Sequence, residues 1–107
     1  MSRSYERRLL EYLRHYREMG SEVKRILKKF DPNVKVYVFG SVVRGRFTAA
    51  SDIDILVVTN ELSKKYEMMV EVYKEVEAPV EIHITTPEKY QSWYRKFIPS
   101  GEIVEID

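Results

Sequence analysis

Residues 34–58, VKVYVFGSVVRGRFTAASDIDILVV, contain two strand-like patterns separated by a turn. The first alternates between valine and larger side chains up to Phe39, which is the two-residue period of a half-buried β-strand. Gly40 and Ser41 end this pattern, because glycine allows a sharp turn of the backbone. The serine offers a hydroxyl and an N–H group that can bind an anion. The second pattern follows ten residues later and consists of Asp52, Ile53, Asp54, Ile55, Leu56, Val57 and Val58.

The two aspartates need an explanation, because the apolar run around them has the composition of an interior strand covered on both faces. Asp52 and Asp54 stand two residues apart and therefore share one face of the strand. Carboxylates placed in this way repel each other unless a cation lies between them. Oxygen ligands suit Mg²⁺ or Mn²⁺, whereas Zn²⁺ prefers the nitrogen and sulfur ligands that this chain mostly lacks. The sequence therefore predicts a divalent metal site at these aspartates.

The connection between the two strands spans residues 42–51 and is short for a parallel crossover with a full helix. We therefore expect antiparallel neighbours joined by one helical turn over 42–45, with Ser41 close to both aspartates. The N–H groups that begin this turn point toward Ser41 and favour an anion there.

Gly40-Ser41, ten further residues and then Asp52-Ile53-Asp54 resemble the G-S-x10-D-x-D signature of the DNA polymerase β-like nucleotidyltransferases. The minimal nucleotidyltransferase branch is further indicated by the flanking Arg44-Gly45 and Ser51. The resemblance implies an α/β (α+β) fold, with a small, mixed, strongly twisted sheet and helices mainly on one face, like the polymerase β palm.

The same resemblance implies the roles of the site residues. Asp52 and Asp54 hold two metal ions, Gly40 and Ser41 hold the triphosphate of the nucleotide, and a third carboxylate on a later strand completes the site.

The candidate for that carboxylate lies in the strand pattern of residues 80–85, VEIHIT. Glu81 and His83 project from the same face of this strand, opposite its apolar residues. Glu81 is the expected third metal ligand, although the family more often has aspartate there. His83 either contacts metal or substrate or is a hydrogen-bonded structural residue.

Two arginines follow the Gly-Ser turn. Either Arg44 or Arg46 contacts triphosphate oxygens, or both are exposed and solvated. Arg44 is the stronger candidate because the family pattern has a basic residue at this position.

The remaining predicted elements are expected to support the site and not to take part in its chemistry. Apolar residues at helical spacing predict a helix over Ser4–Phe30, which Gly20 bends or divides. A second helix is predicted over Leu62–Val76, with Ser63 as its cap and its tyrosines and methionines in the core. A third begins at the Thr86-Pro87 cap, and its aromatic face either packs on the sheet or binds a base or partner. The C-terminal tail either adds an edge strand or is frayed.

The composition predicts one domain over 1–107, since 107 residues suffice for a single core. With 18 basic and 17 acidic residues the net charge is +1, which does not indicate that the protein binds nucleic acid. The first 30 residues carry nine Lys or Arg against four Glu, and form either a solvated helix face or a binding surface. Without cysteine, a long apolar run or a signal-like start, a soluble cytoplasmic protein with no membrane segment is expected.

By this resemblance, the chain moves a nucleoside monophosphate, with AMP from ATP as the expected case, to an acceptor hydroxyl with Mg²⁺ or Mn²⁺ as cofactor. Minimal nucleotidyltransferases commonly act beside an all-helical HEPN protein as antitoxins, some by attaching AMP to a tyrosine of that partner. The alternative from another class is a non-catalytic antitoxin module that binds nucleotide and partner. Transfer to a small molecule or RNA end stays open, and so does homodimerisation.

Overall fold

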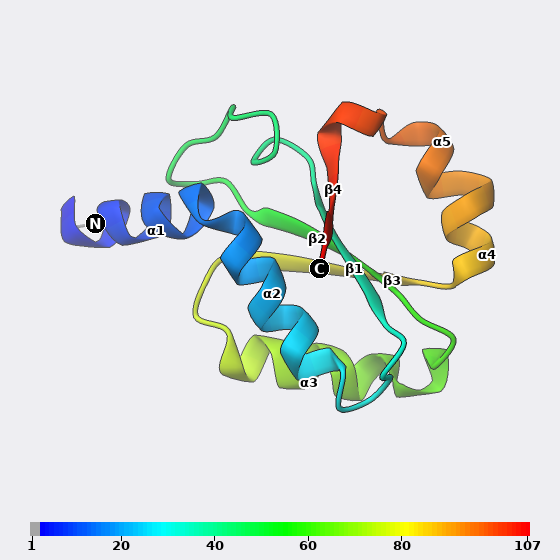
Figure 1. Cartoon of the computed structure of the whole chain (residues 1–107). Helices are drawn as coiled ribbons and strands as arrows, with labels where there is room; N and C mark the ends of the chain where they lie inside the picture. The colour runs from blue at the N-terminus through cyan, green and yellow to red at the C-terminus, as the bar shows by residue number, and fades with distance from the viewer. Residues whose placement is uncertain (1–2) are drawn as a thin grey trace.

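The computed structural model describes residues 3–107 and contains a four-stranded mixed sheet with helices (Figure 1). The strands lie in the order β3-β2-β1-β4 and are β1 Lys35–Phe39, β2 Ile53–Val58, β3 Val80–Thr85 and β4 Ile103–Ile106. The α-helices are α1 Arg3–Arg14, α2 Tyr16–Leu27, α3 Lys65–Glu75, α4 Pro87–Lys89 and α5 Arg95–Phe97. In addition, η1 Leu62–Lys64 and η3 Ser100–Glu102 are 3₁₀ helices, and η2 Tyr90–Tyr94 is a π-helix. Within residues 3–107 no helix is long and apolar enough to cross a membrane. The expected α+β class with a small mixed sheet is confirmed.

β1 and β2 are antiparallel neighbours, as the short connection predicts. Phe39 pairs with Asp54 at one end of the hairpin, and Lys35 pairs with Val58 at the other. β3 runs parallel to β2, and its Glu81 pairs with Asp54. This register places the end of β1 beside the starts of β2 and β3.

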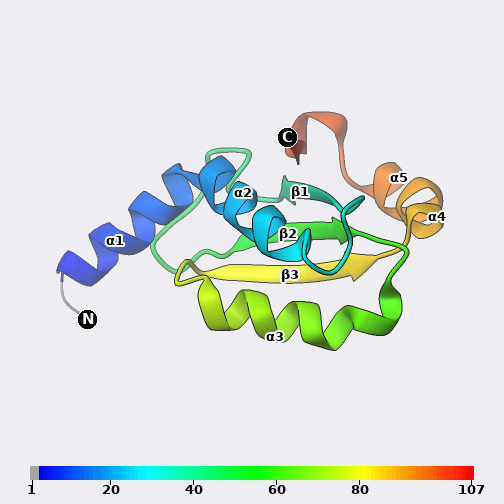
Figure 2. The same ribbon diagram turned by 60° about the horizontal axis from the view of Figure 1, so that its bottom comes forward.

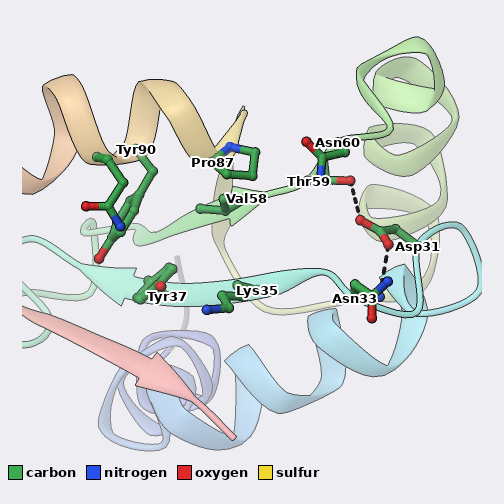
Figure 3. Close-up of a pocket in the computed structure, with 10 residues that line it drawn as sticks. Asp31, Asn33, Lys35, Tyr37, Val58, Thr59, Asn60, Pro87 and Tyr90 are labelled. Atoms are coloured by element: carbon green, nitrogen blue, oxygen red, sulfur yellow. Dashed lines mark hydrogen bonds between the residues drawn. The ribbon is translucent and has the colours of Figure 1, made fainter.

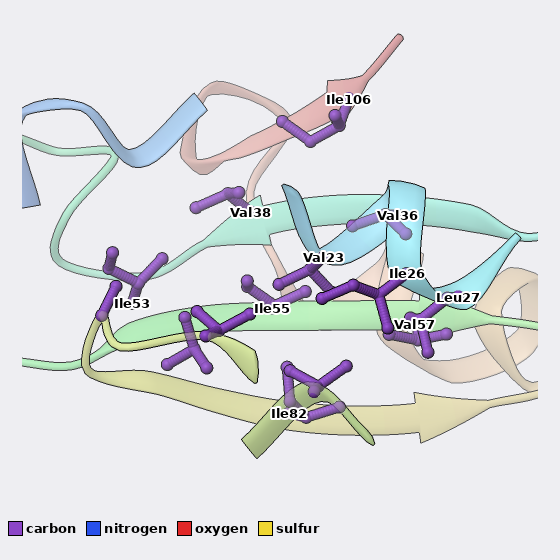
Figure 4. Packing of buried hydrophobic residues seen from close by; sticks show 14 of the residues in the cluster. Val23, Ile26, Leu27, Val36, Val38, Ile53, Ile55, Val57, Ile82 and Ile106 are labelled. Atoms are coloured by element: carbon purple, nitrogen blue, oxygen red, sulfur yellow. The ribbon is translucent and has the colours of Figure 1, made fainter. Parts of the chain in front are cut away.

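One face of the sheet is aliphatic and packs against α2 and α3 (Figures 2 and 4). Its fully buried residues from β2, α2 and α3 include Ile53, Ile55, Val57, Val23, Ile26, Leu27, Met68 and Val72. Complete burial of each such side chain stabilises the fold by about 1.5–3 kcal/mol at most. Because alternate strand residues point to opposite faces, Asp54 belongs to the other face, which we call the polar face.

The polar face is covered at one end by the segment from α4 to α5. Tyr90 and Tyr94 pack over Tyr37 there, and the rings of Tyr37 and Tyr90 stack with their centroids 4.9 Å apart. Trp93 and Phe97 of the same segment are 49% and 66% exposed. The predicted packing of this aromatic face on the sheet is therefore confirmed only in part.

The two predicted helix caps have different outcomes. Thr86 caps α4 as expected, because its hydroxyl oxygen accepts a hydrogen bond from the Lys89 N–H at 3.2 Å. The prediction for Ser63 is wrong. The turn η1 precedes α3, and the N-terminus of α3 after Lys64 has no hydrogen bond from a capping side chain.

The N-terminal helical segment breaks at His15 and not at Gly20, so the expected position of the break is wrong. His15 has φ −102° and ψ 38°, and its ring nitrogens lie 3.4 Å from a Glu11 carboxylate oxygen and 3.3 Å from one of Glu18. Gly20 lies inside α2, where an added Cβ would be 2.8 Å from Cγ1 of Ile106. The glycine permits close packing of α2 on β4, and this packing offsets its cost of about 1 kcal/mol in a helix.

α3 departs from the expectation that its tyrosines belong to the core. Met68 is fully buried, but Tyr66 and Tyr73 are 79% and 50% exposed. The helix runs alongside β3 at the edge of the sheet (Figure 2), so the rest of the protein covers only part of its circumference.

The C-terminal tail forms an edge strand, the first of the two predicted alternatives. β4 pairs antiparallel with β1, with Ile103 opposite Phe39 and Ile106 opposite Val36. The sheet therefore has β3 and β4 as its edges.

Candidate active site

Two neighbouring strands bring carboxylates to one end of the polar face, beside an aromatic residue of the third. Phe39, Asp54 and Glu81 occupy paired positions on β1, β2 and β3. Side chains at paired positions project from the same face, so two carboxylates from different strands lie side by side. Gly40 follows Phe39 directly, and the Gly-Ser turn thus begins beside the carboxylates.

Gly40 packs directly against Asp54. Its φ is +87°, and an added Cβ would lie 2.6 Å from Oδ2 of Asp54. Neither the backbone angle nor the space admits a side chain unless the Asp54 carboxylate moves. The Gly-Ser turn therefore begins against Asp54, whereas the predicted closeness of Ser41 to Asp52 and Asp54 stays a prediction.

Backbone hydrogen bonds fix the turn that follows. The Val43 N–H donates to the carbonyl oxygen of Gly40 at 3.2 Å, and the Arg46 N–H donates to that of Ser41 at 3.0 Å. Val42 is 2% exposed and anchors the turn in the core. Ser41 is therefore held on a short turn of the kind predicted over 42–45.

Among residues 3–107, Asp54, Glu81 and His83 form a group of side chains that could hold a metal ion together. One ligand atom from each lies within 4.8 Å of the others. Asp54 and His83 are half-buried, whereas Glu81 is exposed. The two carboxylates suit Mg²⁺ or Mn²⁺, and the imidazole nitrogen is better suited to Mn²⁺ than to Mg²⁺. Strand alternation correctly placed Glu81 and His83 on the same face.

Asp52 does not join this group among residues 3–107. β2 begins at Ile53, whose N–H donates to the carbonyl oxygen of Pro79 at 2.7 Å, so Asp52 is exposed just before the strand. Its role as a metal ligand stays a prediction.

His83 lies between the two carboxylates. Its Nε2 is 3.6 Å from Oδ1 of Asp54 and 3.9 Å from Oε1 of Glu81, and this buried nitrogen has no hydrogen-bond partner within residues 3–107. The Asp54 carboxylate, assisted by Glu81, raises the pKa of His83 above its usual value, although burial opposes the shift. The same negative field would favour a bound cation.

The two arginines differ in their surroundings. Nη1 of Arg44 lies 2.9 Å from Oε1 of Glu102 in a partly exposed ion pair. Arg46 is exposed, and no carboxylate of the described residues lies within ion-pair distance of it. Contacts of either arginine with phosphate stay predictions.

A cavity of about 250 Å³ lies at the opposite end of the polar face (Figure 3). The carboxylate of Asp31 accepts hydrogen bonds there from the Thr59 hydroxyl at 2.6 Å and the Asn33 N–H at 2.9 Å. The stacked Tyr37 and Tyr90 also line the cavity, and burial raises the pKa of the Tyr37 hydroxyl. Sequence reasoning missed this cavity because its residues come from separate segments without a shared pattern.

A Gly-Ser turn against a strand aspartate, with a further carboxylate on the neighbouring strand of a mixed sheet, defines the class as nucleotidyltransferase-like. The family profile described as "Nucleotidyltransferase domain" matches residues 21–106, and the chain belongs to this family.

Two solved structures resemble the chain. One protein, described provisionally as a nucleotidyltransferase, shares 29% sequence identity with a TM-score of 0.64, over 81% of this chain and 96% of that chain. A second, from Sulfolobus solfataricus and described in the same way, shares 23% identity with a TM-score of 0.55, over 98% of this chain and 87% of its own, and supports the fold alone. Comparison with curated proteins gives no match.

Proposed function

We propose that the chain transfers a nucleoside monophosphate from a nucleoside triphosphate to an acceptor hydroxyl, with AMP from ATP as the expected case. The acceptor oxygen forms a bond to the α-phosphorus, the bond from this phosphorus to the leaving pyrophosphate breaks, and the hydroxyl loses its proton. The observation that carries the proposal is the contact of Gly40 with Asp54, where an added Cβ would lie 2.6 Å from the carboxylate.

The donor atoms on the polar face fit a divalent cation. Asp54 and Glu81 offer carboxylate oxygens, and the buried Nε2 of His83 lacks a hydrogen-bond partner in the described chain. Asp54 and Glu81 would hold Mg²⁺ or Mn²⁺, with Asp52 as the further ligand that the sequence predicts. When bound, the cation stabilises charge on the phosphates and lowers the pKa of the acceptor hydroxyl.

Other groups of the chain bind and orient the nucleotide. The Ser41 hydroxyl and the backbone N–H groups of its turn would bind the outer phosphates. Arg44 would add a charge-assisted hydrogen bond to the leaving pyrophosphate. The Glu81 carboxylate would accept the proton of the acceptor hydroxyl.

The acceptor that we propose is a tyrosine hydroxyl of a HEPN-domain partner, which would make the chain an antitoxin. The resemblance to minimal nucleotidyltransferases supports this acceptor. The alternative is a non-catalytic module that binds nucleotide and partner without transfer.

Thermal melting with Mg²⁺ or Mn²⁺, with ATP and with both tests the site. We expect metal and ATP together to raise the melting temperature more than either alone, because each ligand neutralises charge for the other. Asp54→Asn should lose this joint effect while melting normally without ligands. Identical melting of the natural protein with and without the ligands would contradict a nucleotide site.

A transfer assay with α-radiolabelled ATP and any HEPN-domain protein encoded beside the gene then separates the two functions. Label on a partner tyrosine supports the transferase. A joint melting shift and partner binding without label would support the non-catalytic module.

A further inference from the structure

α3 is apolar around more of its circumference than the core covers. Met68 and Val72 are fully buried, whereas Tyr66, Val70 and Tyr73 are 79%, 64% and 50% exposed. The exposed residues recur at steps of four and three, which places them in one line along the helix. We call Tyr66, Val70 and Tyr73 the α3 stripe.

The stripe is remote from the chemistry of the polar face. α3 contributes its buried residues to the aliphatic face of the sheet, and it runs along the outer side of β3 (Figure 2). Asp54 and Glu81 project from the opposite face. Aligned exposed aromatic and aliphatic side chains on a small protein are typical of an interaction surface.

A partner at this surface would pack side chains and would not extend the sheet. The odd-numbered residues of β3 bond to β2, as the bond from the Thr59 N–H to the Thr85 carbonyl shows, so the even-numbered ones face outward. The outward N–H of Ile82, in the middle of this edge, donates to the Tyr73 hydroxyl at 2.9 Å. Tyr73 therefore blocks the edge against strand addition.

The charges beside the stripe are self-complementary. Glu67 and Lys74 stand seven residues apart and so lie on the same flank of α3, and their midpoint falls beside Val70. Neither has an ion-pair partner within 4.0 Å among residues 3–107. In an antiparallel pair of α3 helices related by a twofold axis near Val70, each Glu67 would face Lys74 of the other copy.

We propose that two copies of this chain associate through the α3 stripe, with the two α3 helices antiparallel. The aromatic rings and Val70 form the centre of the interface, and two symmetric Glu67–Lys74 pairs fix its direction and register. An 11-residue helix is about 16 Å long, so the interface is at the small end for protein pairs. We expect a dissociation constant of about 10–100 μM.

Sedimentation velocity over a concentration series tests the association. The natural protein should shift from monomer to dimer as its concentration rises through the expected dissociation constant of about 10–100 μM. Val70→Glu should stay monomeric, because it places two carboxylates at the twofold axis. Phe97→Glu is the matched control, since Phe97 is 66% exposed like Val70 but lies on α5, and it should dimerise normally. Circular dichroism of each variant at low concentration checks its fold.

A charge exchange tests the register. Glu67→Lys and Lys74→Glu should each weaken self-association about tenfold, because the twofold axis counts each repulsive contact twice. An equimolar mixture of these two variants should dimerise as well as the natural protein, since both contacts are then attractive. Rescue in the mixture confirms antiparallel self-pairing.

Three results would overturn the proposal: a natural protein that stays monomeric up to about 0.5 mM, well above the expected constant, a Val70→Glu variant that dimerises normally, or a mixture without rescue. Binding of a different protein to the stripe of a monomeric chain would likewise overturn self-pairing.

Discussion

The two faces of the sheet use the same strands in opposite ways. On β2, Ile55 is completely buried in the aliphatic core, whereas the preceding Asp54 side chain is 27% exposed on the polar face. On β3, Ile82 is 4% exposed in the core, whereas Glu81 and His83 project beside Asp54. A single residue step therefore separates packing from the proposed chemistry.

This difference implies a division of free energy between the faces. The aliphatic face supplies stability through buried area. The polar face gathers two carboxylates that repel each other without a cation, so it costs stability in the metal-free protein. Substitutions on the two faces should therefore be distinguishable by which measurement they change.

The largest expected effect comes from replacing neighbouring residues on opposite faces. Asp54→Asn should reduce transfer by about 10³-fold or more, because it removes the central carboxylate, and it should leave the free energy of unfolding equal or higher. Ile55→Ala should reduce that free energy by about 2–5 kcal/mol and keep transfer per folded molecule. Denaturant unfolding and the radiolabel assay measure the two quantities. Full transfer in Asp54→Asn, or equal destabilisation by both changes, would contradict the division.

The next comparison is within the polar face, between Glu81 and His83. A carboxylate adds the charge and the oxygen ligand that Mg²⁺ prefers, whereas a neutral imidazole adds neither. Glu81→Gln should therefore lower transfer by about 10²-fold with ATP affinity largely preserved, and His83→Ala should cost much less. Affinity by calorimetry and transfer rates for both variants decide the ranking. The opposite ranking would assign the third ligand position to His83.

Alanine substitutions at Gly40 and Gly45 form a matched pair, and their expected effect on the site is smaller than that of the changes above. Both have positive φ, +87° and +72°, but an added Cβ meets Asp54 at Gly40 and nothing within 4 Å at Gly45. Each alanine variant should lose about 1–2 kcal/mol of stability through backbone strain. Gly40→Ala should also displace the Asp54 carboxylate and weaken metal-dependent ATP binding about tenfold. Thermal melts with and without ligands compare them, and equal ATP binding by both variants would show that the contact has no role in the site.

The end of the polar face that carries Asp54 and Glu81 was largely predictable from sequence, because the residues that determine it lie close together in the chain. The predicted bounds of β3 match the structure, and those of β2 differ only because the strand begins at Ile53 and not at Asp52, since alternation and the flanking turns lie within each segment. The antiparallel pairing of β1 and β2 followed from the length of one loop.

Features set by distant contacts were not predictable. Gly20 continues α2 because Ile106 packs against it from the other end of the chain. Helical spacing alone could not show which of the apolar residues of α3 the edge of the sheet leaves exposed, and Tyr66 was therefore misassigned to the core. Asp31 and Thr59 meet across 28 residues, and no local pattern predicts their hydrogen bond.

The smallest expected effect concerns Arg44, which follows the Gly-Ser turn but is paired with Glu102 at 2.9 Å. This pair is partly exposed and contributes little stability, so replacing either residue should change the free energy of unfolding by less than about 1 kcal/mol. If Arg44 binds the triphosphate, Glu102 competes for it. Arg44→Ala should then weaken ATP binding about fivefold, and Glu102→Gln should strengthen it about twofold at low salt.

The double variant separates this competition from a general effect of charge. In the Arg44→Ala background, Glu102→Gln should leave ATP affinity unchanged, because no guanidinium remains to be released. Calorimetric titration of the four proteins at low and high salt measures this coupling. A Glu102→Gln effect of the same size in both backgrounds would mean that Glu102 acts only through its negative charge and does not compete with the triphosphate for Arg44. An Arg44→Ala variant with unchanged ATP affinity would show that Arg44 has no part in nucleotide binding.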